Sequence, residues 1–247
     1  MNEQLQKTAL VIGAGSTIAA ALIKSLLASN SCDRIVAVSR GRFAAMDEAE
    51  QDKLHYLQSD YSEDSMARIA ARLEREGVQI NQVFLCNGIL HDADVFPEKR
   101  LDDIHETSLQ KVMHVNAFVP LLWLKHLRPL LKGKRPCVVT AFSARVGSIA
   151  DNGHGGWYAY RASKAALNML FKTAAIEIRR LAPNVQFLAF HPGTTDTPLS
   201  EPFQKNVPAN KLFKPAEVAD RLLNLVDKLT GDVPLHFLDW EGKKVEW

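Results

Sequence analysis

Short apolar runs and longer amphipathic segments alternate along the whole chain. Runs of strand length cover residues 7–12, 34–38, 54–58, 82–86, 136–142, 185–191 and 235–238. Between them, apolar residues recur every three or four positions, the period of an amphipathic helix, over residues 18–27, 65–76, 103–131, 160–181 and 215–229. Strands that alternate with helices predict an α/β fold, in which a mainly parallel seven-stranded sheet carries helices on both faces.

The longest amphipathic segment contains two interruptions. Asn116 lies on its apolar face, where a polar side chain needs a hydrogen-bond partner. Pro120 should kink the helix close by. No internal repeat or low-complexity linker divides the 247 residues, so we expect one domain over residues 1–247.

A glycine turn joins the first strand to the first helix. Gly13 and Gly15 follow the strand directly, and Ser16 comes next. Ile18 stands where a G-x-G-x-x-G pattern would have its third glycine. A strand, glycine turn and helix in this order are typical of the βαβ unit whose helix N-terminus holds a phosphate. The segment predicts a Rossmann-type, doubly wound fold with a dinucleotide site, although a glycine turn without a ligand would have the same pattern.

The end of the second strand indicates which dinucleotide is preferred. An acidic residue there would bind the 2′-hydroxyl of NAD(H), whereas an arginine can pair with the 2′-phosphate of NADP(H). Here Ser39 is followed by Arg40, and Arg42 comes two positions later. We therefore expect NADP(H) as the preferred cofactor and NAD(H) as the second choice. Two solvated loop arginines are the alternative.

Two further strand ends carry polar groups that could face the same ligand. Asp60, after the third strand, could cap the next helix together with Glu63 or bind an adenine amino group, and the cap is the preferred interpretation. The fourth strand ends in Asn87 and Gly88, a turn at which the backbone can approach a ligand closely. Ligands of doubly wound sheets bind at these carboxyl ends.

Tyr160 and Lys164 form the candidate catalytic pair. Their spacing of four residues places both side chains on one helical face. A positive charge favours the phenolate, so Lys164 should lower the pKa of Tyr160 from about 10 towards the working range of a general acid. The same spacing occurs by chance in many helices, and only the rest of the chain supports a catalytic role.

Composition argues against several other classes of function. A net charge of +2 and scattered basic residues give no reason to expect a nucleic-acid partner. The three cysteines form no C-x-x-C pair and the eight histidines no metal-binding motif, so neither a disulfide framework nor a metal site is expected. No segment has the length of a membrane span or the flanks of a signal peptide, and we expect a soluble, cytoplasmic protein without a membrane partner.

The ordered set of these residues resembles the short-chain dehydrogenase/reductase family over the whole chain. Its carriers are Gly13-Ala14-Gly15, Asp60, Asn116, Ser143, Tyr160-x-x-x-Lys164 and the segment from Pro192-Gly193 to Thr197. Residues 143–152, 155–168, 191–200 and 237–247 are similar to the C-factor branch of this family and to the sniffer-type carbonyl reductases.

The resemblance implies a hydride transfer between a nicotinamide and a small carbonyl or alcohol substrate. It assigns the proton transfer to Tyr160, and it gives Lys164 the tasks of lowering the tyrosine pKa and binding the nicotinamide ribose. Ser143 would polarise the carbonyl, and Asn116 would support a proton path through water. We expect the cofactor to contact Gly13, Gly15, Ser16, Thr17, Ile18, Ser39, Arg40, Asp60, Tyr61, Asn87, Gly88, Tyr160, Lys164, Pro192, Gly193, Thr195 and Thr197.

The chain departs from the family pattern at two cofactor-binding turns. In the glycine loop, Ile12 replaces the usual threonine, and Thr17 and Ala19 replace the second and third glycines. After the fourth strand, residues 85–88 read Leu-Cys-Asn-Gly in place of Asn-Asn-Ala-Gly.

A third departure concerns the catalytic serine. Alignment on Gly147 puts Ala144 at the serine position, with Ser143 beside it and Ser148 nearby. If one of these serines reaches the carbonyl, the protein is a reductase or, in reverse, an alcohol oxidase. Otherwise it is a cofactor-binding regulatory or cell-signalling protein of the C-factor type with little turnover. The joint presence of the tyrosine, the lysine and Asn116 favours the enzyme.

The segment after the sixth strand is the expected substrate-binding lid, over residues 194–214, with residues 150–157 as a second wall. Trp157, Leu199 and Phe203 indicate an apolar ligand, or else pack beneath the lid. The family also suggests a homodimer or homotetramer. The helix over residues 158–181 is apolar on more than one face, which fits either a partner subunit or a larger contact within one chain.

Overall fold

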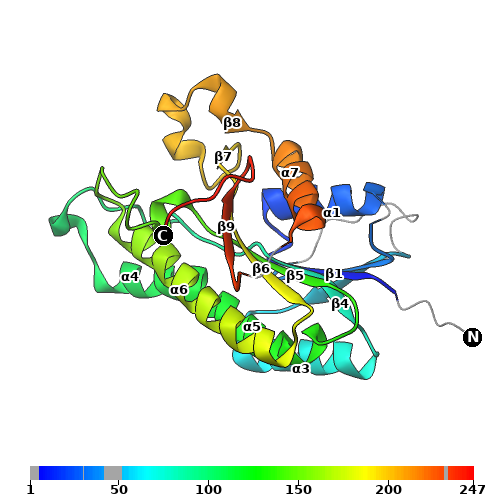
Figure 1. Ribbon diagram of the computed structural model, residues 1–247. Helices are drawn as coiled ribbons and strands as arrows, with labels where there is room; N and C mark the ends of the chain where they lie inside the picture. The colour runs from blue at the N-terminus through cyan, green and yellow to red at the C-terminus, as the bar shows by residue number, and fades with distance from the viewer. Residues whose placement is uncertain (1–5, 30, 42–51, 231–232) are drawn as a thin grey trace, which may run out of the picture.

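One parallel sheet organises the computed structural model, which describes residues 6–29, 31–41, 52–230 and 233–247. In the described part of the chain, seven strands are joined in the order β3-β2-β1-β4-β5-β6-β9, and every neighbouring pair is parallel (Figure 1). The strands are β1 (Thr8–Ile12), β2 (Arg34–Ser39), β3 (Leu54–Gln58), β4 (Ile80–Leu85), β5 (Cys137–Phe142), β6 (Val185–His191) and β9 (His236–Asp239). The strand order reverses between β1 and β4, and a crevice opens at such a switch point. The predicted doubly wound, seven-stranded sheet is confirmed.

Helices cover both faces of this sheet (Figure 1). The helices α1 (Thr17–Ser29) and α7 (Pro215–Lys228) pack together on one face. The other face carries α3 (Glu63–Arg75), α4 (Glu106–Met113), α5 (Val119–Leu131) and α6 (Tyr158–Leu181). Along β1, Leu10 and Ile12 enter the core below α5 and α6, while Ala9 and Val11 enter the core below α1 and α7. Strands buried on both faces explain why the strand runs are apolar throughout.

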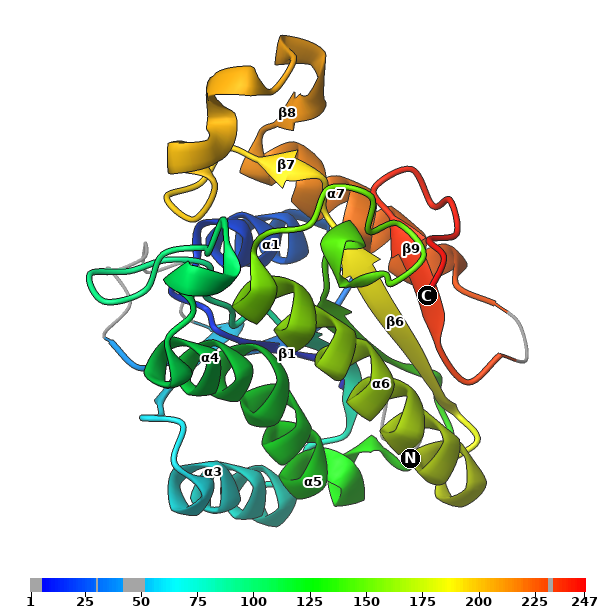
Figure 2. The ribbon, with the colours of Figure 1, turned by 90° about the vertical axis from the view of Figure 1, so that its left-hand side faces the viewer.

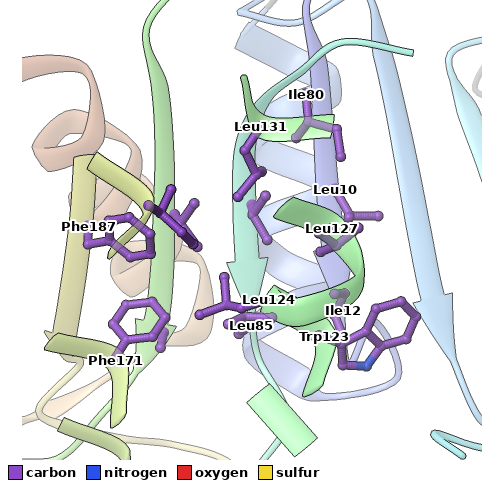
Figure 3. Packing of buried hydrophobic residues seen from close by; sticks show 14 of the residues in the cluster. Leu10, Ile12, Ile80, Leu85, Trp123, Leu124, Leu127, Leu131, Phe171 and Phe187 are labelled. Carbon is purple, nitrogen blue, oxygen red and sulfur yellow. The ribbon is translucent and has the colours of Figure 1, made fainter. Parts of the chain in front are cut away.

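The larger core fixes the height of α6 above the sheet. Figure 3 shows Phe171 of α6 next to Phe187 of β6. Their ring centroids lie 5.2 Å apart in an edge-to-face arrangement. Leu124 and Leu127 of α5 lie among side chains of β1 and β4, and Trp123 is completely buried. Aromatic packing of this kind holds a helix in one register, so the first turns of α6 are held at a set distance from the carboxyl end of β5.

The predicted long helix over residues 103–131 is divided by a π-helical turn. A 3₁₀ turn covers Leu101–Asp103, α4 begins only at Glu106, and residues His114–Phe118 form the π turn before α5. Pro120 has no N–H to donate to the carbonyl of Asn116, and the Val119 N–H bonds instead to the His114 carbonyl, five residues back. The predicted interruption near Pro120 thus takes the form of a wide turn centred on Asn116.

The α3 helix begins earlier than the predicted range 65–76, because Ser62 caps it. The Ser62 hydroxyl accepts a hydrogen bond from the Ser65 N–H at 3.2 Å. Asp60 in turn accepts from the Ser62 N–H at 2.9 Å and from its hydroxyl at 2.7 Å. Glu63 pairs with Lys125. The prediction that Asp60 caps the helix with Glu63 is wrong. Ser62 is the cap, and Asp60 holds Ser62 in place.

A folded segment stands above the sheet edge between β6 and α7 (Figure 2). It contains β7 (Thr194–Thr195), two 3₁₀ turns at Glu201–Asn206 and Ala209–Lys211, and β8 (Leu212–Phe213). The two short strands pair in parallel and close the segment at its base. The segment covers residues 194–214, for which the sequence predicts a substrate-binding lid, and it is called the lid below.

Candidate active site

A continuous cleft follows the carboxyl ends of β1, β4, β5 and β6. Three adjoining cavities form it, with volumes of about 580, 330 and 250 Å³. The first and second share Gly15, Ser16 and the turn at residues 86–88. The second and third share Ile18, Ser143, Tyr160, Pro192, Thr197 and Leu199. The structure therefore brings the glycine turn, the tyrosine and the lid into one space.

At Gly13 the glycine turn is packed too closely for a side chain. Gly13 has a φ of +81°, and a Cβ there would lie 2.7 Å from the Asn87 nitrogen at the end of β4. Gly15 faces only the Ser39 side chain, at 3.8 Å. The Ser16 hydroxyl accepts from the Ala19 N–H at 3.2 Å and so caps α1. A bare turn at the N-terminus of a 13-residue helix fits the pyrophosphate of a dinucleotide.

The far end of the cleft carries the residues predicted to bind the adenosine. Ser39, Arg40 and Asp60 line the cavity of about 580 Å³, and Arg40 is exposed. Tyr61 lines it too, although its ring meets Trp123 edge-on at 6.0 Å and burial raises the pKa of its phenol to about 12. A charged guanidinium at this edge fits a 2′-phosphate. Arg42 lies outside the described residues.

Lys164 is buried and Tyr160 is half-buried, one turn apart on the first part of α6. The Lys164 ammonium donates to the Phe142 carbonyl at 2.8 Å and lies 5.6 Å from the centroid of the Tyr160 ring. Burial raises the pKa of Tyr160 to about 12 and lowers that of Lys164 to about 8. The predicted lowering of the tyrosine pKa by the lysine is therefore wrong, because desolvation outweighs the attraction between the two groups. A phenol with this pKa keeps its proton at neutral pH.

Asn116 connects three parts of the site. Its side-chain oxygen accepts from the Ile89 N–H at 2.7 Å, and its amide nitrogen donates to the Ile89 carbonyl at 2.8 Å and to the Ser163 hydroxyl at 3.0 Å. A Cβ on Gly88 would lie 3.5 Å from the Asn116 oxygen and 3.7 Å from the Lys164 nitrogen. The buried asparagine thus has its partners, and it fixes the turn after β4 against the lysine.

Ser143 reaches the cleft, whereas Ser148 does not line it. Ser143 lines both the second and the third cavity, and its hydroxyl lies 2.7 Å from the Asn168 side-chain oxygen, to which it donates. Ala144 lines the third cavity. The Ser148 hydroxyl accepts from the Asp151 N–H at 3.2 Å and completes a turn. Of the two serines, Ser143 has the access that a carbonyl-binding hydroxyl needs.

The turn after β6 and the lid form the remaining wall. A Cβ on Gly193, whose φ is +73°, would lie 2.6 Å from the Phe213 ring. Thr195 lines the third cavity and Thr197 the second and third. Phe203 packs edge-to-face against Trp157 with ring centroids 4.9 Å apart, and both residues line the third cavity. The aromatic residues therefore pack beneath the lid and also offer an apolar surface to a ligand.

Three residues that support the site were not predicted from the sequence. Glu98 is buried and accepts from the Ala159 N–H at 3.1 Å, which caps α6 from a distant loop. The His91 ring nitrogen Nε2 lies 3.1 Å from the carbonyl oxygens of Pro198 and Leu199 and so contacts the lid. Asn168 could have been found, because it continues the spacing of four residues from Tyr160 and Lys164. Glu98 and His91 carry no such signal.

The described residues offer neither a membrane span nor a metal cluster. No helix in these ranges is long and apolar enough to cross a membrane. In the same ranges, no three His, Cys, Asp or Glu side chains are grouped as a metal ion would require.

Comparisons with known proteins find similar chains over most of the sequence. Residues 7–208 match the family model described as short chain dehydrogenase. The chain is 30% identical over 187 residues to 1-hydroxy-2-glutathionyl-2-methyl-3-butene dehydrogenase from Rhodococcus sp. (strain AD45), covering 75% of this chain and 76% of that protein. It is 31% identical over 147 residues to C-signal from Myxococcus xanthus, covering 60% and 83%. The solved NADPH-bound carbonyl reductase from chicken fatty liver has a TM-score of 0.81 at 24% identity, covering 100% of this chain and 96% of that one.

Proposed function

This chain belongs to the short chain dehydrogenase family, and we propose that it is an NADP(H)-dependent oxidoreductase that interconverts a carbonyl and an alcohol. The observation that carries this proposal is the single cleft lined by the glycine turn, Tyr160 and Lys164. A dinucleotide at the N-terminus of α1 and a substrate beside the tyrosine would meet there. Bound NADP(H) supplies or accepts the hydride at the substrate carbon.

Tyr160 acts as the general acid for reduction and as the base for the reverse reaction. Its pKa of about 12 keeps the phenol protonated at neutral pH, the form that donates to a carbonyl oxygen. Lys164, whose pKa is about 8, is largely charged at pH 7 and stabilises the phenolate as it forms. Lys164 would also hold the nicotinamide ribose, Ser143 would donate to the carbonyl oxygen, and Asn116 would support the return of a proton through water.

Arg40 determines the preference for NADP(H) over NAD(H) in this proposal. It follows β2, lines the cavity of about 580 Å³ and has no acidic neighbour at residues 39 or 41 to repel a phosphate. The remaining proposed cofactor contacts are those named from the sequence. Among them, Gly193 and Thr195 line only the cavity of about 250 Å³.

The substrate occupies the cavity of about 250 Å³, between Tyr160 and the lid over residues 194–214. Trp157 and Phe203 provide an apolar wall, and Ser143 and Tyr160 provide polar groups for one oxygen atom. This combination suits a small carbonyl compound with an apolar substituent.

A panel of aldehydes, ketones and quinones tests the proposal, with NADPH oxidation followed by absorbance. We expect at least one carbonyl to be reduced, and we expect Tyr160→Phe to lower that rate by about a hundredfold or more, the scale of a positioned general acid. Binding of NADPH to this variant should be unchanged in a fluorescence titration. An undiminished rate in Tyr160→Phe would show that the proton has another source.

A cofactor-binding signalling protein with little turnover is the second candidate. Two observations favour it: the relative C-signal, and Ala144 at the position where the family has its serine. A blank panel in a protein that binds NADPH tightly would support this second function against the first.

A homodimer or homotetramer is also proposed for the working protein. Met169 and Ile176 on α6 are 67% and 40% exposed, and Phe118 before α5 is 45% exposed. Apolar side chains on neighbouring helices suit a partner subunit. Sedimentation at micromolar concentration that shows only monomer would contradict this.

A further inference from the structure

Asn168 continues the row of functional side chains on α6. It lies one turn beyond Lys164 and two turns beyond Tyr160, and it is 4% exposed. Lys164 holds the carbonyl of Phe142, the last residue of β5, and Asn168 contacts the hydroxyl of the next residue, Ser143. Two successive turns of the helix therefore hold two successive residues at the strand end.

The direction of the bond between Ser143 and Asn168 decides what Ser143 can do. A serine hydroxyl has one proton. When Ser143 donates to the Asn168 oxygen, at 2.7 Å, that proton points away from any carbonyl in the cleft. In this arrangement the buried amide nitrogen of Asn168 has no partner among the described residues. An unpaired buried donor costs about 1–3 kcal/mol.

The opposite orientation of the amide removes both difficulties. The oxygen and nitrogen ends of a side-chain amide have nearly the same shape, so the hydrogen-bond network determines which end faces Ser143. With the nitrogen towards Ser143, one amide N–H donates to the serine oxygen and the serine proton becomes free for the cleft. The amide oxygen is then left without a partner, which proteins tolerate more readily than an unpaired N–H.

We infer that Asn168 is a positioning residue, which donates to the Ser143 hydroxyl and so directs the serine proton to the substrate carbonyl. The inference rests on the proposed carbonyl reduction. It also explains how Ser143 serves at a strand end where Ala144 has replaced the usual serine. Because Ser143 lines both the second and the third cavity together with Tyr160, a serine proton that is not held by Asn168 can point into the cleft beside the tyrosine.

A double-mutant cycle on the fastest-reduced aldehyde or ketone of the panel tests this role. We expect Ser143→Ala to lower kcat by about a hundredfold or more, as the loss of one preorganised donor does. Asn168→Ala should lower kcat about tenfold in the wild-type background and less than twofold beside Ser143→Ala, because it acts only through that hydroxyl. The Kd for NADPH should stay unchanged in all three variants. If the loss of kcat in the double variant equals the product of the losses in the two single variants, the inference is overturned. It is also overturned if Asn168→Ala is inactive while Ser143→Ala is fully active.

Asn168→Asp adds a readout that a merely structural role would not change. An ionised carboxylate only accepts, so it would retain the serine proton and slow reduction as much as Ser143→Ala. Protonation of the carboxyl at lower pH restores a donor, and kcat should then rise towards the wild-type value. A pH profile of Asn168→Asp parallel to that of the wild type would contradict the proposed direction of the bond.

Neutron diffraction of the deuterated protein with NADP⁺ bound gives an answer independent of turnover. Deuterium on Asn168 pointing at the Ser143 oxygen supports the inference, and deuterium on Ser143 pointing at Asn168 overturns it. If Tyr160→Phe abolishes reduction while Ser143→Ala leaves it unchanged, the role of Asn168 fails and the proposed function stands. If Tyr160→Phe has no effect, the proposed function itself fails.

Discussion

Gly147 lies where the loop after β5 meets α6, and a single methyl group there should disturb the catalytic helix. A Cβ on Gly147 would lie 2.7 Å from the Cβ of Lys164, 2.8 Å from its carbonyl carbon and 3.1 Å from the Ala165 nitrogen. Carbon atoms in contact normally lie about 3.5–4.0 Å apart, so Gly147→Ala must separate loop and helix by about 1 Å. Two of the three atoms that block the methyl group belong to the backbone of the helix, so no flexible side chain can yield for them.

Two effects should follow from this displacement. Overpacking of a tight contact costs about 1–3 kcal/mol, and at about 2–4 °C per kcal/mol for a chain of this size we expect a drop in Tm of about 2–12 °C. Lys164 and Tyr160 would move relative to Ser143, and a shift of about 1 Å in a catalytic group lowers the rate about a hundredfold. NADPH binding should weaken less than the rate does, because the displacement affects the proposed ribose contact of Lys164 but not the glycine turn.

Gly153→Ala is the matched control for this experiment. Gly153 belongs to the same loop region, and a Cβ there would meet no atom within 4 Å. Thermal unfolding, a fluorescence titration with NADPH and the rate of carbonyl reduction should be measured on both variants. If Gly147→Ala matches Gly153→Ala in Tm and in rate, the close contact between loop and helix does not position the site.

Four further predictions have defined outcomes. Arg40→Asp should weaken NADPH binding about tenfold or more, which is the contribution of a hydrogen bond to a charged group. NADH binding should not weaken. If the wild-type protein binds NADPH and NADH with equal affinity in a fluorescence titration, Arg40 does not have this role. Glu98→Ala should destabilise the protein by about 1–3 kcal/mol through the lost cap of α6, whereas Glu98→Gln, which keeps an acceptor, should lose less on thermal unfolding. The rate of reduction should be constant below pH 8 and fall above it, because Lys164, with its pKa of about 8, loses its proton there while Tyr160 keeps its own. Lys164→Arg should move this fall to higher pH or remove it. A wild-type rate that rises between pH 8 and 10 would contradict this explanation. The contribution of Lys164 to stability should rise from about pH 8 to about 10.5, because the unfolded chain binds the Lys164 proton more tightly than the folded one does. Burial raises the pKa of the three cysteine thiols and acts in the opposite direction, so the measurement is the difference in unfolding free energy between the wild type and Lys164→Met, which should rise over this interval.

The fold could be predicted because its signals are local and repeated. Strands buried on both faces require continuous apolar runs, and the helices between them show their amphipathic period, so the order of elements follows from the sequence alone. Boundaries were less certain where a single hydrogen bond decides them. Ser62 rather than Asp60 caps α3 because its hydroxyl meets the Ser65 N–H, and nothing in the two residue types distinguishes them as caps.

The residues of the candidate site also differ in whether a local sequence pattern reveals them. Tyr160, Lys164 and Asn116 could be singled out because each breaks an apolar helical pattern or sits at a repeating spacing. Glu98 could not, since its contact with the Ala159 N–H joins positions 61 residues apart, and only the folded chain brings them together. The direction of the tyrosine pKa was predicted wrongly because the sequence shows the neighbouring charge and not the depth of burial, which here has the larger effect.

The same contrast between sequence pattern and packing applies to residues 143 and 144, where the chain has serine and then alanine and the family has its serine at the second position. A hydroxyl moved one residue back along the chain would ordinarily face the opposite side of a strand. Ser143 lies just beyond β5, where its N–H still bonds to the Phe190 carbonyl at 2.8 Å but its side chain reaches the cleft beside α6. Asn168 supplies the contact that holds it there, at a position one turn beyond the lysine. Replacement of Asn168 should therefore lower the rate of carbonyl reduction only when residue 143 carries the hydroxyl. The variant Ser143→Ala/Ala144→Ser should reduce carbonyls at a rate that does not change when Asn168 is replaced.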